Sequence, residues 1–185
     1  MDRRTSAEGR LFLAALPDAA TASRIFRLAG GLKRAHGFSG KLIAPQRLHI
    51  SLFFLGGFSS EVTNAAPTTF VELRMSPFKV SFDRTASFRG PPGSCPFVLV
   101  GGEGLSQLKS FRQGLATAWA REGLMRLANT SFEPHVTLLY DARCVEEYPL
   151  AEPISWIINE IVLIHSRNGH AHLAKWRLRA QEKRI

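Results

Sequence analysis

The sequence contains few cysteines and no long apolar run. Its two cysteines, Cys95 and Cys144, are too few for a disulfide framework or a zinc site, so we expect both thiols to be reduced. No apolar stretch approaches the ~20 residues that a membrane-spanning helix needs. The first apolar stretch, residues 11–16, is too short for the core of a secretory signal. These absences predict a cytoplasmic protein without a membrane span.

Acidic residues are also scarce. The chain has 15 Asp and Glu against 24 Lys and Arg, which gives a net charge of +9 and a pI near 10.4. This balance favours a polyanionic partner, such as nucleic acid, an anionic membrane or a phosphate ester. Many basic residues crowd the two ends of the chain, so the charge favours an RNA or phosphate partner without locating a site.

The remaining composition is that of a globular protein. Hydrophobic residues make up 45% and charged residues 21%, which excludes a disordered or fibrous chain. A length of 185 residues predicts one domain, or two small lobes that share a core.

The spacing of apolar residues predicts alternating strands and helices. Strands are expected at residues 10–16, 47–55, 78–87, 97–100, 132–140, 157–165 and 172–178, the last two as a pair around Asn168 and Gly169. Helices are expected from Asp18 as N-cap to about Ala35, from Ser59 or Ser60 to about Arg74, and over residues 105–119. Residues 90–93 and 141–153 are expected to be loops.

The order strand–helix–strand occurs twice at a constant offset. His49 and His135 are 86 residues apart (135 − 49), and the same offset places the strand at residues 11–14 on the strand at residues 97–100. We therefore predict a duplication, with units at about residues 10–56 and 96–141. Two such halves would pack around a pseudo-twofold axis, with the two histidine strands meeting at a shared cleft.

Each repeated strand carries a histidine followed two residues later by a hydroxyl. Strand side chains alternate between faces, so His49 and Ser51 point one way, as do His135 and Thr137. Two imidazoles and two hydroxyls around one small anion suit in-line displacement at phosphorus. One neutral imidazole takes a proton from water, and one imidazolium gives a proton to the leaving oxygen.

The alternative is that both histidines have only a structural role, as packed side chains within their strands. For one His-x-Ser/Thr triplet this is the better interpretation, because the pattern is so short. Two copies at matching places in a duplicated unit favour a site instead.

The chain resembles the 2H phosphoesterases, and within them the bacterial RNA 2′,3′-cyclic phosphodiesterases, historically called 2′-5′ RNA ligases. The resemblance is carried by four segments: RLFLAALP, RLHISLFFLGGF, FEPHVTLLYD and INEIVLIHSRNGHAHLAKWRL. It implies a bilobal α+β fold of two antiparallel sheets with outer helices, in which the HxS/T strands face a central cleft. Residues 1–185 would then form a single domain of two interleaved lobes.

The resemblance also implies an activity and a set of roles. The activity is hydrolysis of a 2′,3′-cyclic phosphate, at an RNA end or in a small cyclic nucleotide, to a 2′-phosphomonoester. His49 would be the proton donor to the departing O3′ and His135 the proton acceptor from water. Ser51 and Thr137 would bind the phosphate oxygens. No cofactor, no metal and no membrane partner is expected, and the chain would act as a monomer.

Two rival functions stay open. One is a 2′-5′ phosphodiesterase or 2′-5′ RNA ligase that uses the same site. The other is an RNA-binding module with little or no catalysis.

Tyr140 departs from the family pattern, which often has Arg at this position. Tyrosine donates one hydrogen bond but has no charge, and strict alternation places it on the face opposite His135. Arg47 or Arg143 would have to compensate. The resemblance further suggests that His170 or His172 lines the mouth of the cleft. These two histidines have no evident third partner, so we favour a surface hairpin over a metal site there.

Overall fold

The computed structural model describes residues 10–56, 76–91, 93–121, 131–167 and 169–179. Its strands are β1 (Arg10–Ala15), β2 (Ile50–Gly56), β3 (Phe78–Ser87), β4 (Cys95–Val100), β5 (Val136–Asp141), β6 (Tyr148–Ile158), β7 (Glu160–Ser166) and β8 (His170–Arg177). Its helices are α2 (Ala19–His36) and α4 (Ser106–Arg121), with short 3₁₀ turns at Pro45–Arg47 and Glu103–Leu105. None of the helices in these ranges is long and apolar enough to cross a membrane.

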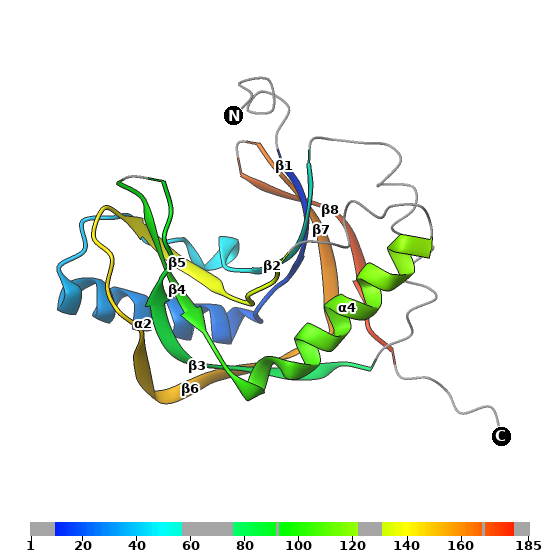
Figure 1. Ribbon diagram of the computed structural model, residues 1–185, viewed down its shortest axis with the longest axis horizontal. Coiled ribbons are helices and arrows are strands. Elements are labelled where there is room, and N and C mark those ends of the chain that lie inside the picture. The colour runs from blue at the N-terminus through cyan, green and yellow to red at the C-terminus, as the bar shows by residue number, and fades with distance from the viewer. Residues whose placement is uncertain (1–9, 57–75, 92, 122–130, 168, 180–185) are drawn as a thin grey trace.

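The fold is α+β, as expected, but the strands form one antiparallel sheet and not two. Their order is β6-β3-β4-β5-β2-β1-β7-β8, which is visible in Figure 1 as two halves that meet between β5 and β2. The register between these central strands consists of one residue pair, Ile50 opposite Val136. A single pair is enough to make the sheet continuous, which is why the prediction of two separate sheets is wrong. The pseudo-twofold relation between the halves stays a prediction.

Both long helices cover the same face of the sheet. Ile25 of α2 and Phe111 of α4 belong to one buried core with Leu13 of β1 and Phe97 of β4. The opposite face has two smaller apolar clusters, one on each half of the sheet. They consist of Phe12, Ala14, Val162 and Ile164, and of Ala86, Val98 and Val100. Strand alternation therefore separates a helix-covered face from a second face that carries these clusters.

The boundaries of α2 follow from its capping residues. The Asp18 carboxylate accepts a hydrogen bond from the Thr21 N–H at 2.9 Å, as predicted for an N-cap. The helix ends at His36 because Gly37 adopts a left-handed conformation with φ of 65°.

Both histidine strands begin later than predicted. The 3₁₀ turn at Pro45–Arg47 occupies the expected start of β2, and Pro134, which has no N–H for a sheet hydrogen bond, precedes β5. His49 and His135 consequently lie immediately before their strands.

The predicted loop at residues 141–153 is confirmed for residues 142–147 and wrong for residues 148–153. β6 begins at Tyr148 and pairs with β3. It is an edge strand, where the prolines that suggested a loop are tolerated. The single strand expected at residues 157–165 is divided between the end of β6 and β7. The helix expected from Ser59 or Ser60 to about Arg74 lies outside the described residues.

The two cysteines form a disulfide, which corrects the expectation that both are reduced. Cys95 starts β4, where it lies opposite Asp141 at the end of β5. Cys144 follows three residues later, so its Cα is 5.5 Å from that of Cys95 although the two are 49 residues apart in sequence. The antiparallel register brings them together, and cysteine spacing alone does not reveal that register.

Candidate active site

His49 and His135 lie on either side of the residue pair that joins the two halves of the sheet. Ile50 and Val136, which directly follow them, are opposite each other and fully buried in the main core. Side chains next to a core-facing strand residue point to the other face. Both imidazoles therefore project from the face that α2 and α4 leave uncovered.

The two triplets are arranged around this central pair. In each strand the histidine precedes the central pair and the hydroxyl residue follows it, so His49 and Ser51 flank Ile50 while His135 and Thr137 flank Val136. The four residues predicted from the two triplets therefore all adjoin the one pair that joins the two halves of the sheet.

Each imidazole is oriented by the same backbone contact. Nδ1 of His49 lies 2.7 Å from the carbonyl oxygen of Arg47, and Nδ1 of His135 lies 2.8 Å from that of Glu133. A carbonyl only accepts, so Nδ1 is the protonated nitrogen in each ring. Nε2 is then the atom that accepts a proton in the neutral ring and donates one in the imidazolium.

Aromatic rings pack against both histidines. Phe12 and His170 contact His49, with ring centroids at 5.0 and 5.2 Å. Phe88 contacts His135 edge-on at 4.9 Å. Phe88 could not be singled out from the sequence, because it follows a predicted strand and belongs to neither repeated unit.

Burial lowers the pKa of His49 below the ordinary histidine value. Repulsion from His135 and Arg47 lowers it further, while the hydrogen bond to the Arg47 carbonyl opposes the shift. At His170, burial together with repulsion from His49 and Arg47 lowers the pKa to about 4.

Tyr140 lies on the same face as Thr137, which corrects the expectation from strict alternation. Thr137 and Leu139 pair with adjacent residues of β4, so Leu138 is a bulge residue that shifts the alternation by one. The Tyr140 side chain is exposed. β2 has an equivalent bulge at Leu52, and this bulge leaves Phe54 exposed.

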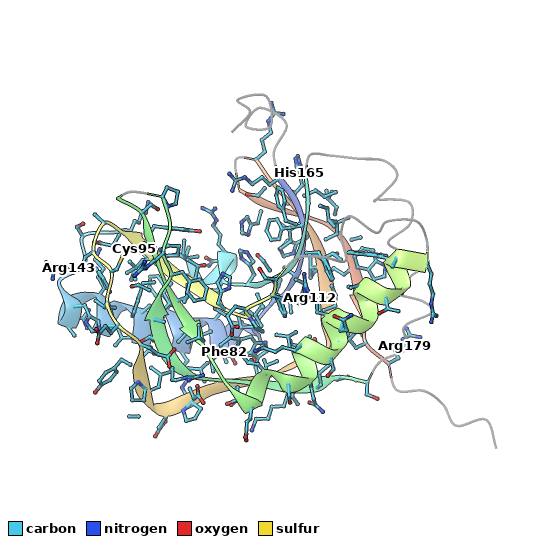
Figure 2. The ribbon with its side chains drawn as sticks, in the orientation of Figure 1. Phe82, Cys95, Arg112, Arg143, His165 and Arg179 are labelled. Atoms are coloured by element: carbon cyan, nitrogen blue, oxygen red, sulfur yellow. A yellow bond between two sulfur atoms is a disulfide. The ribbon has the colours of Figure 1, made fainter. Side chains whose placement is uncertain are left out.

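The structure separates the two arginines considered as replacements for a charge at Tyr140. Arg143 donates from Nη1 to the carbonyl oxygen of His36 at 2.8 Å, at the end of α2 (Figure 2). Arg47, in contrast, exerts its charge on both His49 and His170. Of the two arginines, Arg47 is therefore the one that lies beside the histidines.

Arg112 supports β2 from the core side and was not singled out from the sequence. Its Nε donates to the carbonyl oxygen of the bulge residue Leu52 at 3.0 Å, and its guanidinium lies 4.4 Å from the ring centre of Phe53 (Figure 2). Arg112 lies among the buried apolar residues of α4. The sequence alone does not indicate which residue its side chain contacts. Among the described residues, no group of three His, Cys, Asp or Glu side chains is arranged to hold a metal ion.

The comparisons with known proteins agree with this fold. The family model of the 2′-5′ RNA ligase superfamily matches residues 17–170. An RNA 2′,3′-cyclic phosphodiesterase of Archaeoglobus fulgidus is 31% identical over 108 residues, a match that spans 58% of this chain and 60% of that relative.

Two solved structures are similar over nearly their whole length. A crystal structure of a phosphoesterase is 27% identical, with a TM-score of 0.71, and the match covers 92% of this chain and 99% of that one. E. coli LigT in complex with 3′-AMP is 25% identical, with a TM-score of 0.70 and coverage of 92% and 98%. Fold and family together define a phosphoesterase of the 2H class. The chain belongs to the 2′-5′ RNA ligase superfamily.

Proposed function

We propose that the chain hydrolyses RNA 2′,3′-cyclic phosphate ends, or small cyclic nucleotides, to 2′-phosphomonoesters, with His49 and His135 as general acid and base. The observation that carries the proposal is the matched pair of imidazoles. Each has Nδ1 on the carbonyl two residues upstream, and the two flank one buried residue pair. This arrangement leaves both Nε2 atoms free of those backbone bonds and available for proton transfer.

In the proposed reaction, Nε2 of neutral His135 takes a proton from a water molecule while the water oxygen attacks phosphorus. The P–O3′ bond breaks on the opposite side, and its electron pair stays on O3′. Nε2–H of the His49 imidazolium gives its proton to that oxygen. Each positioned acid or base contributes roughly 10²–10⁴ in rate. No step in this scheme requires a metal ion.

The hydroxyls of Ser51 and Thr137 are proposed to donate to the non-bridging phosphate oxygens. Their position supports this role, because each lies two residues after a candidate catalytic histidine, on strands that meet at the Ile50–Val136 pair. Arg47 supplies positive charge nearby, and Tyr140 offers a further hydroxyl on the same face.

The relatives support the substrate class. The Archaeoglobus relative is an RNA 2′,3′-cyclic phosphodiesterase, and LigT was crystallised with 3′-AMP. A 2′,3′-cyclic phosphate forms only where a 2′-hydroxyl was present, so the substrate derives from RNA.

The order of the helices and strands supports an internal duplication. β1-α2-β2 and β4-α4-β5 repeat the order strand–helix–strand. We infer that residues 1–185 act as one domain of two lobes and as a monomer, since both histidines come from one chain.

The test is turnover of a short RNA that ends in a 2′,3′-cyclic phosphate, in EDTA, with the 2′- and 3′-phosphate products resolved by chromatography. We expect a 2′-phosphate product. A 3′-phosphate product, or loss of activity in EDTA that zinc restores, would contradict the mechanism. If the folded protein leaves this RNA intact but cleaves or joins 2′-5′ linkages, the rival enzyme is correct. Binding without any turnover would identify an RNA-binding module.

A further inference from the structure

We propose that His170 is a positioning residue for His49, whose imidazole it holds in place and shields from water. The inference deepens the proposed function, since it concerns the histidine that we assign as proton donor. It assigns no contact between His170 and the substrate.

The geometry is a triangle of three rings from three separate parts of the chain. Phe12 belongs to β1, His170 starts β8, and His49 precedes β2. Their ring centroids are 5.0 Å (Phe12–His49), 5.5 Å (Phe12–His170) and 5.2 Å (His49–His170) apart. All three distances lie in the range of favourable aromatic contact, about 4.5–7 Å.

The contact between His170 and His49 is not a by-product of strand pairing. β8 is separated from β2 by both β1 and β7. In a flat sheet, three inter-strand steps would place them roughly 14 Å apart. The two rings nevertheless lie within 5.2 Å of each other, so they meet across the face of the sheet and not through neighbouring strands.

Together with the backbone contact, these rings restrain His49 from several sides. Nδ1 is fixed by the Arg47 carbonyl, while Phe12 and His170 pack against the ring. Within the described ranges, His135 has one such ring contact, with Phe88. The two imidazoles therefore differ in their surroundings although their backbone contacts match.

His170 suits this role because it is neutral at working pH. The groups that act on it are His49, Arg47 and His172, and burial adds to their effect, so that its pKa is about 4. The groups that act on His49 are His135 and Arg47. Near neutral pH, the His170 ring is therefore uncharged and does not repel a protonated His49.

The experiment is an NMR pH titration of the His49 ring in wild type, His170→Ala, His170→Phe and His172→Ala. The His49 signal is assigned with His49→Ala, and thermal unfolding checks that each variant is folded. We expect His170→Ala to raise the titration midpoint of His49 toward 6.5, the ordinary value, because water then reaches the ring. His170→Phe keeps a ring in place and should hold the midpoint near that of wild type. His172→Ala is the matched control on the same strand and should leave it unchanged.

The kinetic counterpart is the pH dependence of kcat/KM. In His170→Ala we expect the pH profile of kcat/KM to shift to higher pH together with the His49 midpoint, and kcat to fall while KM changes little. The inference is overturned if the titration midpoint of His49 in His170→Ala equals that of wild type. It is also overturned if His172→Ala shifts this midpoint as much as His170→Ala does. The NMR titration does not depend on turnover. A chain that hydrolyses no cyclic phosphate would refute the proposed function, but the titration would still test the role of His170.

Discussion

Ile50 and Val136 lie opposite each other where the two halves of the sheet meet, and each directly follows one of the two candidate catalytic histidines. Both side chains are fully buried on the helix-covered face. This pair therefore fixes the two strand starts against each other. The imidazoles next to it project together from the opposite face, so the spacing of the proposed acid and base follows from the packing of the core.

The lowered pKa of His49 leads to a prediction about pH dependence. Interacting histidines titrate as a pair, and burial with mutual repulsion disfavours adding the second proton. We expect kcat/KM for a cyclic nucleotide to follow a bell-shaped pH profile whose acidic limb lies below pH 6.5, the ordinary histidine value. Initial rates between pH 4 and 9, roughly the range that brackets histidine titration, would measure it. An acidic limb at or above 6.5 would contradict the environment described for His49.

The two roles can be separated with a substrate whose leaving group needs no proton. In an aryl phosphodiester, p-nitrophenolate departs without being protonated, so the general acid contributes little to the rate. Activation of water by the general base is still needed. We expect the defect of His49→Ala to shrink at least about tenfold relative to the cyclic phosphate, because general acid catalysis no longer contributes its usual share.

His135→Ala is the matched control and should keep its full defect on both substrates. If the aryl substrate instead reduces the rate defect of His135→Ala and leaves that of His49→Ala unchanged, the two roles are reversed.

Much of the framework could be predicted from the sequence, because it rests on local signals. Asp18 caps α2 as expected, and the bounds of β3 agree with the predicted 78–87. The paired triplets led to His49 and His135, which the structure brings into electrostatic interaction.

The rest depends on contacts that no local pattern encodes. The bulges at Leu52 and Leu138 shift the alternation of β2 and β5, and only the pairing with the neighbouring strands reveals them. The same holds for the ring of His170 against His49, which comes from a strand three positions away in the sheet. β6 escaped prediction because its edge position tolerates prolines that are typical of loops.

Asp141 should make stability depend on acid pH. Its carboxylate accepts hydrogen bonds from the N–H groups of Arg143 and Gly40, at 2.9 and 2.6 Å, and from the Ser39 hydroxyl at 3.2 Å. These bonds lower the pKa of Asp141 from 3.8 to about 2. A group with a depressed folded-state pKa stabilises the fold above its unfolded value, and this contribution disappears as pH falls through the folded value.

We therefore expect the free energy of unfolding of wild type to decrease between pH 4 and 2 more steeply than that of Asp141→Asn, which has no such titration. Urea unfolding at several pH values measures both slopes. Parallel slopes would show that Asp141 does not titrate as described.

The disulfide should contribute measurable stability. Cys95 and Cys144 close a loop with a sequence separation of 49, and bridges of this kind typically stabilise by about 2–4 kcal/mol, chiefly by restricting the unfolded chain. We expect a reductant to lower the urea midpoint of wild type to that of Cys144→Ser. The variant itself should not respond to the reductant, and an unresponsive wild type would argue against the bridge.

The central claim is that His49 and His135 act together on one chemical step. Its most direct test is kcat/KM for a 2′,3′-cyclic phosphate RNA with wild type, His49→Ala, His135→Ala and the double variant, each checked for folding by circular dichroism. We predict that each single variant loses roughly 10²–10⁴ in rate. The double variant should be little slower than either single one, because residues that act as a unit are not additive. A single variant that keeps near wild-type activity would contradict the account.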